Sequence, residues 1–176
     1  MTRALVFGSR SLTTRHLTIM RLVARHAMFE GSARPLADWM KMADNEERLW
    51  ELRPLRLHDG GSFLLMHADD MPSRRSGAIG AAKLAECAAR IEWAGQWTSR
   101  RFSVEHDVGV EKYEVAEERR NAAIIAAKPN RIYCVHPHLD KPGASLNLAN
   151  ALTRSGLRFW HIHVTHGGAV VTVEER

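Results

Sequence analysis

The sequence has few cysteines and no long hydrophobic run. Its two cysteines, Cys87 and Cys134, provide neither a disulfide framework nor the ligand spacing of a zinc site. No apolar stretch approaches the roughly 20 residues that a membrane-spanning helix needs, so we expect no association with a membrane. The apolar stretch at residues 4–7 is too short for a signal peptide. These absences favour a cytoplasmic protein.

Two fingerprints of phosphate-binding loops are also missing, since the chain contains neither GxGxxG nor GxxxxGK[ST]. The charge nevertheless favours an anionic partner. Lysines and arginines number 25 against 20 aspartates and glutamates, which gives a formal net charge of +5 and a pI near 9.7. Arginine binds phosphate through a planar fork, so both a nucleotide and a nucleic acid fit this composition. The positive charges are scattered rather than gathered in one stripe, and charge alone does not decide between the two.

Short apolar runs alternate with amphipathic stretches along the chain. Strands are predicted at residues 3–7, 62–67, 97–106, 131–135 and 158–164. Helical spacing predicts helices at 17–27, 79–91, 115–127 and 146–152. Strands that alternate with helices form a mostly parallel sheet covered on both faces, and Gly167-Gly168 indicates a hairpin after it. We therefore expect a single α/β domain over residues 1–176, a Rossmann-like three-layer fold with an antiparallel C-terminal hairpin.

A series of short motifs follows the predicted strands. They read ALVFGSRSLT, FLLMHADD, SGAIGAAKLAECA, EERRNAAIIAA, IYCVHPHLDKPGASLNLANAL and SGLRFWHI. In order and spacing they resemble the SLOG superfamily, the Rossmann-like group that contains DprA/Smf and the LOG phosphoribohydrolases, and in particular its YspA/YpsA-related branch. The resemblance covers about residues 3–164. Residues 30–60 look like a helical insertion on that plan, for which we expect a role in an interface of a homo-oligomer.

Several positions depart from the pattern of that superfamily. Ala68 and Glu117 stand where the pattern has glycine, Ala82 where it has aspartate, and Ala144 where it has threonine. The PGGxGTxxE motif of the LOG enzymes is absent, so their catalytic arrangement does not carry over intact. The resemblance implies a divergent member that keeps a ligand site while catalysis is lost or altered.

The carboxyl edge of the predicted sheet is where we expect a ligand, because strands turn into helices there. Glycines allow close backbone approach, and free N–H groups at a helix start favour an anion. The resemblance adds the Arg-Asn pair of the EERRN motif. The predicted ligand-binding residues are Gly8, Ser9, Arg10, His67, Asp69, Gly77, Gly80, Arg120, Asn121, Gly143, Ala144 and Ser145.

Each of these assignments has a structural alternative. Arg10 and Arg120 are interpreted as phosphate ligands, and Asn121 as a hydrogen-bond partner of a ribose or base edge. Arg10 also fits a surface turn, and Arg120-Asn121 also fits a capping and salt-bridging pair. Ser145 also fits a plain helix N-cap in a connecting loop.

The histidines are considered separately as metal ligands. The chain has 10 of them, and a transition-metal site needs three or four that converge. His161 and His163 share one face of a predicted strand, which supplies at most two ligands. We therefore predict surface histidines and no metal.

The resemblance implies a protein that binds a phosphorylated nucleotide derivative, NAD-like, ADP-ribose-like or another nucleoside phosphate, as a sensor or processing protein. No other cofactor is predicted. If the protein is an enzyme, hydrolysis of an N-glycosidic or phosphoester bond is expected, with Asp69, Asp70 or Glu118 as acid or base. Two alternatives stay open: a DNA- or RNA-associated protein of the DprA type, and a partner-binding module without catalysis.

Overall fold

A computed structural model describes residues 1–28, 36–41, 63–69, 77–93, 97–105 and 109–176. Its strands are β1 (Thr2–Gly8), β2 (Phe63–Asp69), β3 (Trp97–Ser103), β4 (Arg131–His136), β5 (Trp160–Val164) and β6 (Val170–Glu175). They form a six-stranded sheet in the order β3-β2-β1-β4-β5-β6, in which β1 to β5 are parallel and β6 is antiparallel to β5. The prediction of a mostly parallel α/β sheet with an antiparallel C-terminal hairpin is confirmed.

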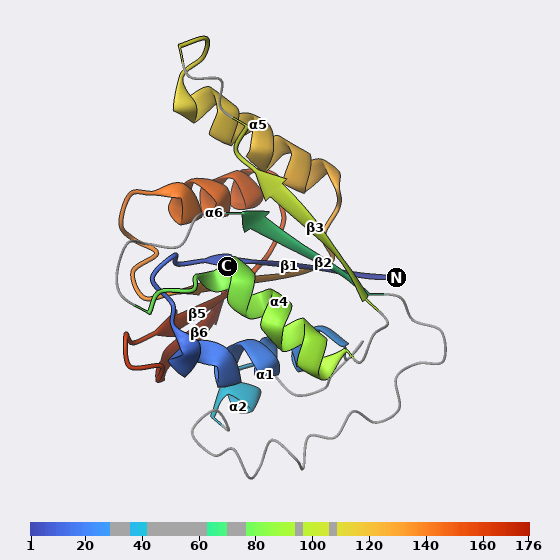
Figure 1. The fold of residues 1–176 in the computed structure, drawn as a ribbon, viewed down its shortest axis with the longest axis vertical. Helices are drawn as coiled ribbons and strands as arrows, with labels where there is room; N and C mark the ends of the chain where they lie inside the picture. The colour runs from blue at the N-terminus through green and yellow to red at the C-terminus, as the bar shows by residue number, and fades with distance from the viewer. Residues whose placement is uncertain (29–35, 42–62, 70–76, 94–96, 106–108) are drawn as a thin grey trace.

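Helices cover both faces of the sheet and complete the three layers (Figure 1). The helices on one face are α1 (Leu17–Met28), α2 (Leu36–Met40) and α4 (Ala81–Glu92), with the short 3-10 helix η1 (Thr14–His16) before α1. The helices on the other face are α5 (Tyr113–Ala126) and α6 (Ala144–Arg154). None of the described helices is long and apolar enough to cross a membrane.

The sequence of β1 explains its central place. Ala4 and Val6 belong to the core cluster under α1 and α4, whereas Leu5 and Phe7 belong to the cluster under α5 and α6. All four are buried, because successive side chains of a strand point to opposite faces and here both faces are covered. A strand at the edge of the sheet need not be apolar on both faces, and the polar edge strand β3 is mostly exposed.

Element boundaries differ from the sequence prediction by one to three residues, and one predicted region lies partly outside the described residues. The strand predicted at 97–106 ends at Ser103, and the helix predicted at 115–127 runs over Tyr113–Ala126. Of the helical insertion predicted at about 30–60, α2 is described, while residues 29–35 and 42–62 lie outside the described residues.

The C-terminal hairpin depends on a glycine. The Thr165 N–H bonds the Ala169 carbonyl at 2.8 Å, and Gly168 has φ of 94° within this turn. A Cβ at Gly168 would lie 2.5 Å from the carbonyl oxygen of Arg15, so the turn sits directly on η1. The predicted Gly167-Gly168 hairpin is confirmed, and the second glycine is the one that the packing requires.

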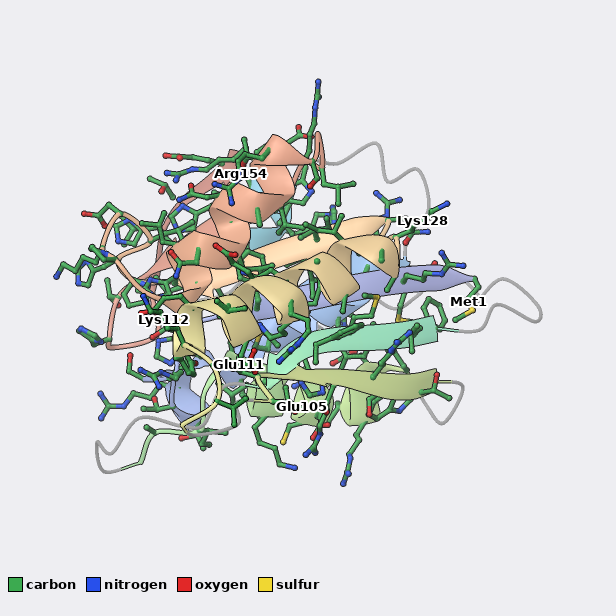
Figure 2. All side chains as sticks on the ribbon, turned by 90° about the horizontal axis from the view of Figure 1, so that it is seen from above. Met1, Glu105, Glu111, Lys112, Lys128 and Arg154 are labelled. Atoms are coloured by element: carbon green, nitrogen blue, oxygen red, sulfur yellow. The ribbon has the colours of Figure 1, made fainter. Side chains whose placement is uncertain are left out.

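The strand order fixes where the loops meet. β1 and β4 are neighbours at the centre, and the chain leaves them toward opposite faces, through α1 after β1 and through α6 after β4. Such a topological switch point opens a crevice at the carboxyl ends of the strands. In Figure 2, Met1 and Lys128 lie on the amino side of the sheet, and Lys112, at the start of α5, lies on the opposite side.

Candidate functional site

The loops after β1 and β4 are held against each other by hydrogen bonds. The Ser9 N–H donates to the Val135 carbonyl at 3.0 Å, and the Ser145 hydroxyl donates to the Gly8 carbonyl at 2.9 Å. Gly8 is required for this approach, because a Cβ there would lie 2.0 Å from the Val135 oxygen. The close approach at Gly8 is therefore to β4, and the residues that follow it form the site.

A pocket of about 440 Å³ opens where these two loops meet. This volume lies within the range of roughly 300–1,000 Å³ that small-molecule sites occupy. Its lining consists of Ser9, Arg10, Ser11, His136, Pro137, His138, Lys141, Pro142, Gly143, Ala144, Ser145, Leu146 and His166. The structure thus brings together the predicted residues of the first and third loops, at the switch point of the sheet.

The N-terminus of α6 forms one wall of the pocket. Helix α6 begins after Gly143, which accepts a bond from the Asn147 N–H at 3.0 Å and has no side chain to cap the helix. The first N–H groups of a helix lack intrahelical partners, and here they belong to Ala144, Ser145 and Leu146, which line the pocket. The helix dipole adds partial positive charge at this point.

The charged and titratable side chains in the described lining are all basic, because each is a cation or becomes one on protonation. Arg10 and Lys141 are exposed, and His136, His138 and His166 complete the set. Among the described residues, no aspartate or glutamate lines the pocket. An arrangement of cations, hydroxyls and helix N–H groups attracts an anion.

The tautomer of His136 is fixed by its neighbour. The backbone N–H of His138 donates to the Nδ1 of His136 at 2.9 Å, so Nδ1 is an acceptor and the ring proton sits on Nε2. Burial, and after it the nearby His161 and His138, lowers the pKa of His136 to about 4. His136 therefore offers the pocket a neutral N–H donor at physiological pH.

The predicted glycines before α4 lie beside this pocket rather than in its lining. The N–H groups of Ile79 and Gly80 both donate to the Leu12 carbonyl, at 2.7 and 3.0 Å, and the Ala81 N–H donates to the Ser9 carbonyl at 3.0 Å. The N-terminal donors of α4 are thus used to fix the loop after β1. Gly77 is exposed and is not part of the pocket lining.

His67 is buried and belongs to a polar cluster under α4. Its Nε2 lies 3.2 Å from Oε1 of Glu86, which also accepts bonds from Lys83 and Arg101. Burial by itself would raise the pKa of Glu86, but the hydrogen bonds from Lys83 and Arg101 outweigh it and lower that pKa. The structure places His67 in the packing between β2 and α4.

Arg120 and Asn121 are buried in α5, and neither lines the pocket at Gly143. The Arg120 guanidinium donates to Asn121 Oδ1 at 3.0 Å and to Glu117 Oε1 at 3.4 Å, and Glu117 accepts a bond from Asn147 of α6 at 3.1 Å. Arg120 lines a separate pocket of about 230 Å³ at the end of β3. Glu105, labelled in Figure 2, belongs to the lining of that second pocket.

Glu118, one of the predicted acid–base residues, is exposed on α5 and does not line the larger pocket. Asp69 is the last residue of β2, and Asp70 lies outside the described residues. Among the described residues, the titratable side chains that line the pocket, apart from Arg10, are His136, His138, Lys141 and His166. Sequence reasoning missed these four as site residues.

A signal for three of the missed residues was present in the sequence. His136, His138 and Lys141 stand in the same HPHLDKPG loop that supplied Gly143. No pattern in the sequence around His166 marks it as a site residue, because it reaches the pocket through the hairpin after β5. No three histidine, cysteine or carboxylate side chains converge to hold a metal ion in the described part of the chain.

Comparison with protein-family models, curated proteins and solved structures finds no match to this chain. A fold by itself does not define a function, so the function is argued from the chemistry of the pocket.

Proposed function

We propose that the protein binds a phosphorylated nucleotide derivative in the pocket between the loops after β1 and β4. The phosphate is proposed to lie at the N-terminus of α6, within reach of Arg10 and Lys141. This is the ligand class that the resemblance to the SLOG superfamily implies, and membership of that superfamily is part of the proposal.

The observation that carries the proposal is the charge of the lining. Arg10, Lys141 and the N–H groups at the start of α6 face one cavity, and no carboxylate of the described residues lines it. The cavity lies at the switch point of the sheet, where open α/β sheets place their ligands. Its volume of about 440 Å³ exceeds what one inorganic phosphate needs and leaves room for a ribose and a base.

Isothermal titration of the full chain with ADP-ribose, ADP and adenosine tests the proposal. We expect ADP-ribose or ADP to bind and adenosine to bind at least about tenfold more weakly, because charge-assisted bonds to phosphate contribute about 1.5–3 kcal/mol each. Binding of adenosine as tight as that of ADP would contradict a phosphate site, and so would the absence of binding by every phosphorylated ligand.

Arg10→Ala provides the residue-level test, with Arg154→Ala as its matched control. Arg10 is exposed and lines the pocket, whereas Arg154 is exposed in the last turn of α6, at the far end of that helix. We expect Arg10→Ala to weaken ADP or ADP-ribose binding about tenfold or more. Both variants are expected to keep the free energy of unfolding within about 0.5 kcal/mol of the parent. Equal affinity of the two variants would remove Arg10 from the site.

A further inference from the structure

We propose that the pocket takes up protons when it binds an anion, so that its affinity for anions increases as the pH falls. The inference rests on the proposed function and concerns the histidines that the fold gathers on one side of the pocket. Anion binding and its pH dependence are measured separately, and the pH dependence can fail while the anion site stands.

The histidines come from three separate segments. His136 ends β4, His138 follows it in the loop, and His166 stands in the hairpin turn, and all three line the pocket. His161 and His163 of β5 lie beside them. Ring centroids are 6.0 Å apart for His138 and His166, 6.4 Å for His138 and His163, and 6.2 Å for His161 and His163.

Among the described residues, basic groups outnumber carboxylates on the elements around this cluster. The ionisable groups on these elements are Arg10, Arg15, His16, Cys134, Asp140, Lys141, Glu174 and Arg176. Of the two carboxylates, neither lines the pocket, and Asp140 is exposed. Most of the charged groups on these elements are therefore basic, which favours the approach of an anion.

His136 and His161 are not the rings that take up the protons. Protonation of His136 at Nδ1 would break the bond that it accepts from the His138 N–H. His161 is buried, and burial, followed by the charge of Arg176, lowers its pKa. His138 and His166 are exposed and His163 is half-buried, and we assign the proton uptake to these three rings.

An anion in the pocket changes the electrostatic environment of these rings. Its negative charge favours the imidazolium form of the neighbouring rings, and imidazoles change charge between about pH 5 and 8. Because linkage is reciprocal, an anion that promotes protonation must bind more tightly when protons are abundant. Uptake of one proton changes the affinity by up to about tenfold per pH unit.

Sulfate is the appropriate probe, because its charge stays constant across this range while that of phosphate changes. We expect the full chain to bind sulfate at least about tenfold more tightly at about pH 5.5 than at about pH 7.5, at constant ionic strength in chloride. Titration of the histidine ring signals by NMR, with and without sulfate, should show the pKa of two or more imidazoles rising on sulfate binding.

The double variant His138→Gln/His166→Gln tests which rings are responsible. The measured quantity is the ratio of sulfate affinities at the two pH values, which we expect to fall to less than about threefold. Arg154→Ala, which changes charge away from the cluster, should keep the parent's ratio. If the double variant does not fold, the NMR titration of the parent decides.

The outcomes separate the two proposals. Sulfate affinity that is equal at both pH values, or histidine signals that titrate identically with and without sulfate, would overturn proton uptake and leave the proposed anion site standing. The absence of sulfate binding by the parent at either pH would overturn the anion site together with this inference. A parent-like ratio in the double variant would show that other groups take up the proton, which contradicts the assignment to these rings.

Discussion

The hydroxyl of Ser145, in the first turn of α6, donates a hydrogen bond of 2.9 Å to the carbonyl of Gly8, the last residue of β1. The two residues are 137 positions apart in the chain. This bond ties the loop after β4 to the end of β1, and it sets the position of the N–H groups that line the pocket.

We predict that Ser145→Ala lowers the free energy of unfolding by about 1 kcal/mol, the usual contribution of a hydrogen bond, and also weakens ADP binding. Ser155→Ala is the matched control, because the Ser155 hydroxyl bonds the Ala151 carbonyl within the same helix at 2.9 Å and joins no second element. Urea unfolding measures the first effect and isothermal titration the second. A smaller loss of affinity in Ser145→Ala than in Ser155→Ala would show that the Gly8 bond does not organise the pocket.

Gly8→Ala is predicted to destabilise the protein by more than about 3 kcal/mol or to prevent folding. The added Cβ would lie 2.0 Å from the Val135 carbonyl oxygen, and φ at this position is 151°. Gly167→Ala is the control, since its Cβ would make an ordinary contact of 3.6 Å with Thr165 Oγ1, and we expect it to cost less than about 1 kcal/mol. Denaturant unfolding distinguishes them, and equal midpoints would contradict the packing at Gly8.

Gly143→Val is predicted to abolish binding of ADP or ADP-ribose. A Cβ at Gly143 would meet no protein atom within 4 Å, so the added bulk would project into space that we assign to the phosphate. Gly143→Ala is the matched variant, because it carries the same backbone φ of 158° with a far smaller side chain. Affinity should fall in the order Gly, Ala, Val in isothermal titration. Parent-like binding by Gly143→Val would make the loop a connector only.

Acid is predicted to destabilise the fold through His26. Its Nδ1 forms a hydrogen bond of 2.7 Å with the Tyr133 hydroxyl, and burial, followed by the charge of Arg131, lowers the pKa of His26 from 6.5 to about 4. Between these two values the unfolded chain binds the proton and the native state does not, so stability falls as the pH decreases through this window. The loss amounts to about 3 kcal/mol for this group.

The pH dependence of the urea midpoint between about pH 7 and pH 4 measures this effect. His26→Gln should reduce the slope of the urea midpoint against pH, because the titrating group is gone. Tyr133→Phe should retain most of that slope, because the imidazole of His26 stays buried. An unchanged slope in His26→Gln would assign the acid sensitivity to other groups. His136 is one such group, because its pKa is also lowered to about 4.

Local sequence determined the elements of this protein. The apolar run at residues 4–7, ended by Gly8-Ser9, indicates a strand buried on both faces, and the spacing of Leu84, Ala85 and Ala88 fits one buried face of a helix, which α4 presents. Turn chemistry at Gly167-Gly168 likewise indicated the hairpin. These features follow from side-chain periodicity and backbone preferences, which act between residues close in sequence.

Tertiary structure decided which loops share a site. The sequence predicted equivalent roles for the loops after the first three buried strands. The chain leaves the neighbouring strands β1 and β4 toward opposite faces of the sheet, and the described residues of those two loops line the pocket. Residues 70–76 of the loop after β2 lie outside the described residues. The donors of Ile79 and Gly80 are used by Leu12, and Arg120 is bonded to Glu117 and Asn121. His166 reaches the pocket because β5 lies next to β4. Hydrogen bonds and charge contacts between distant segments do not appear as a periodic pattern in the sequence. The residues that line the site are therefore determined by how the strands pair and not by a single motif.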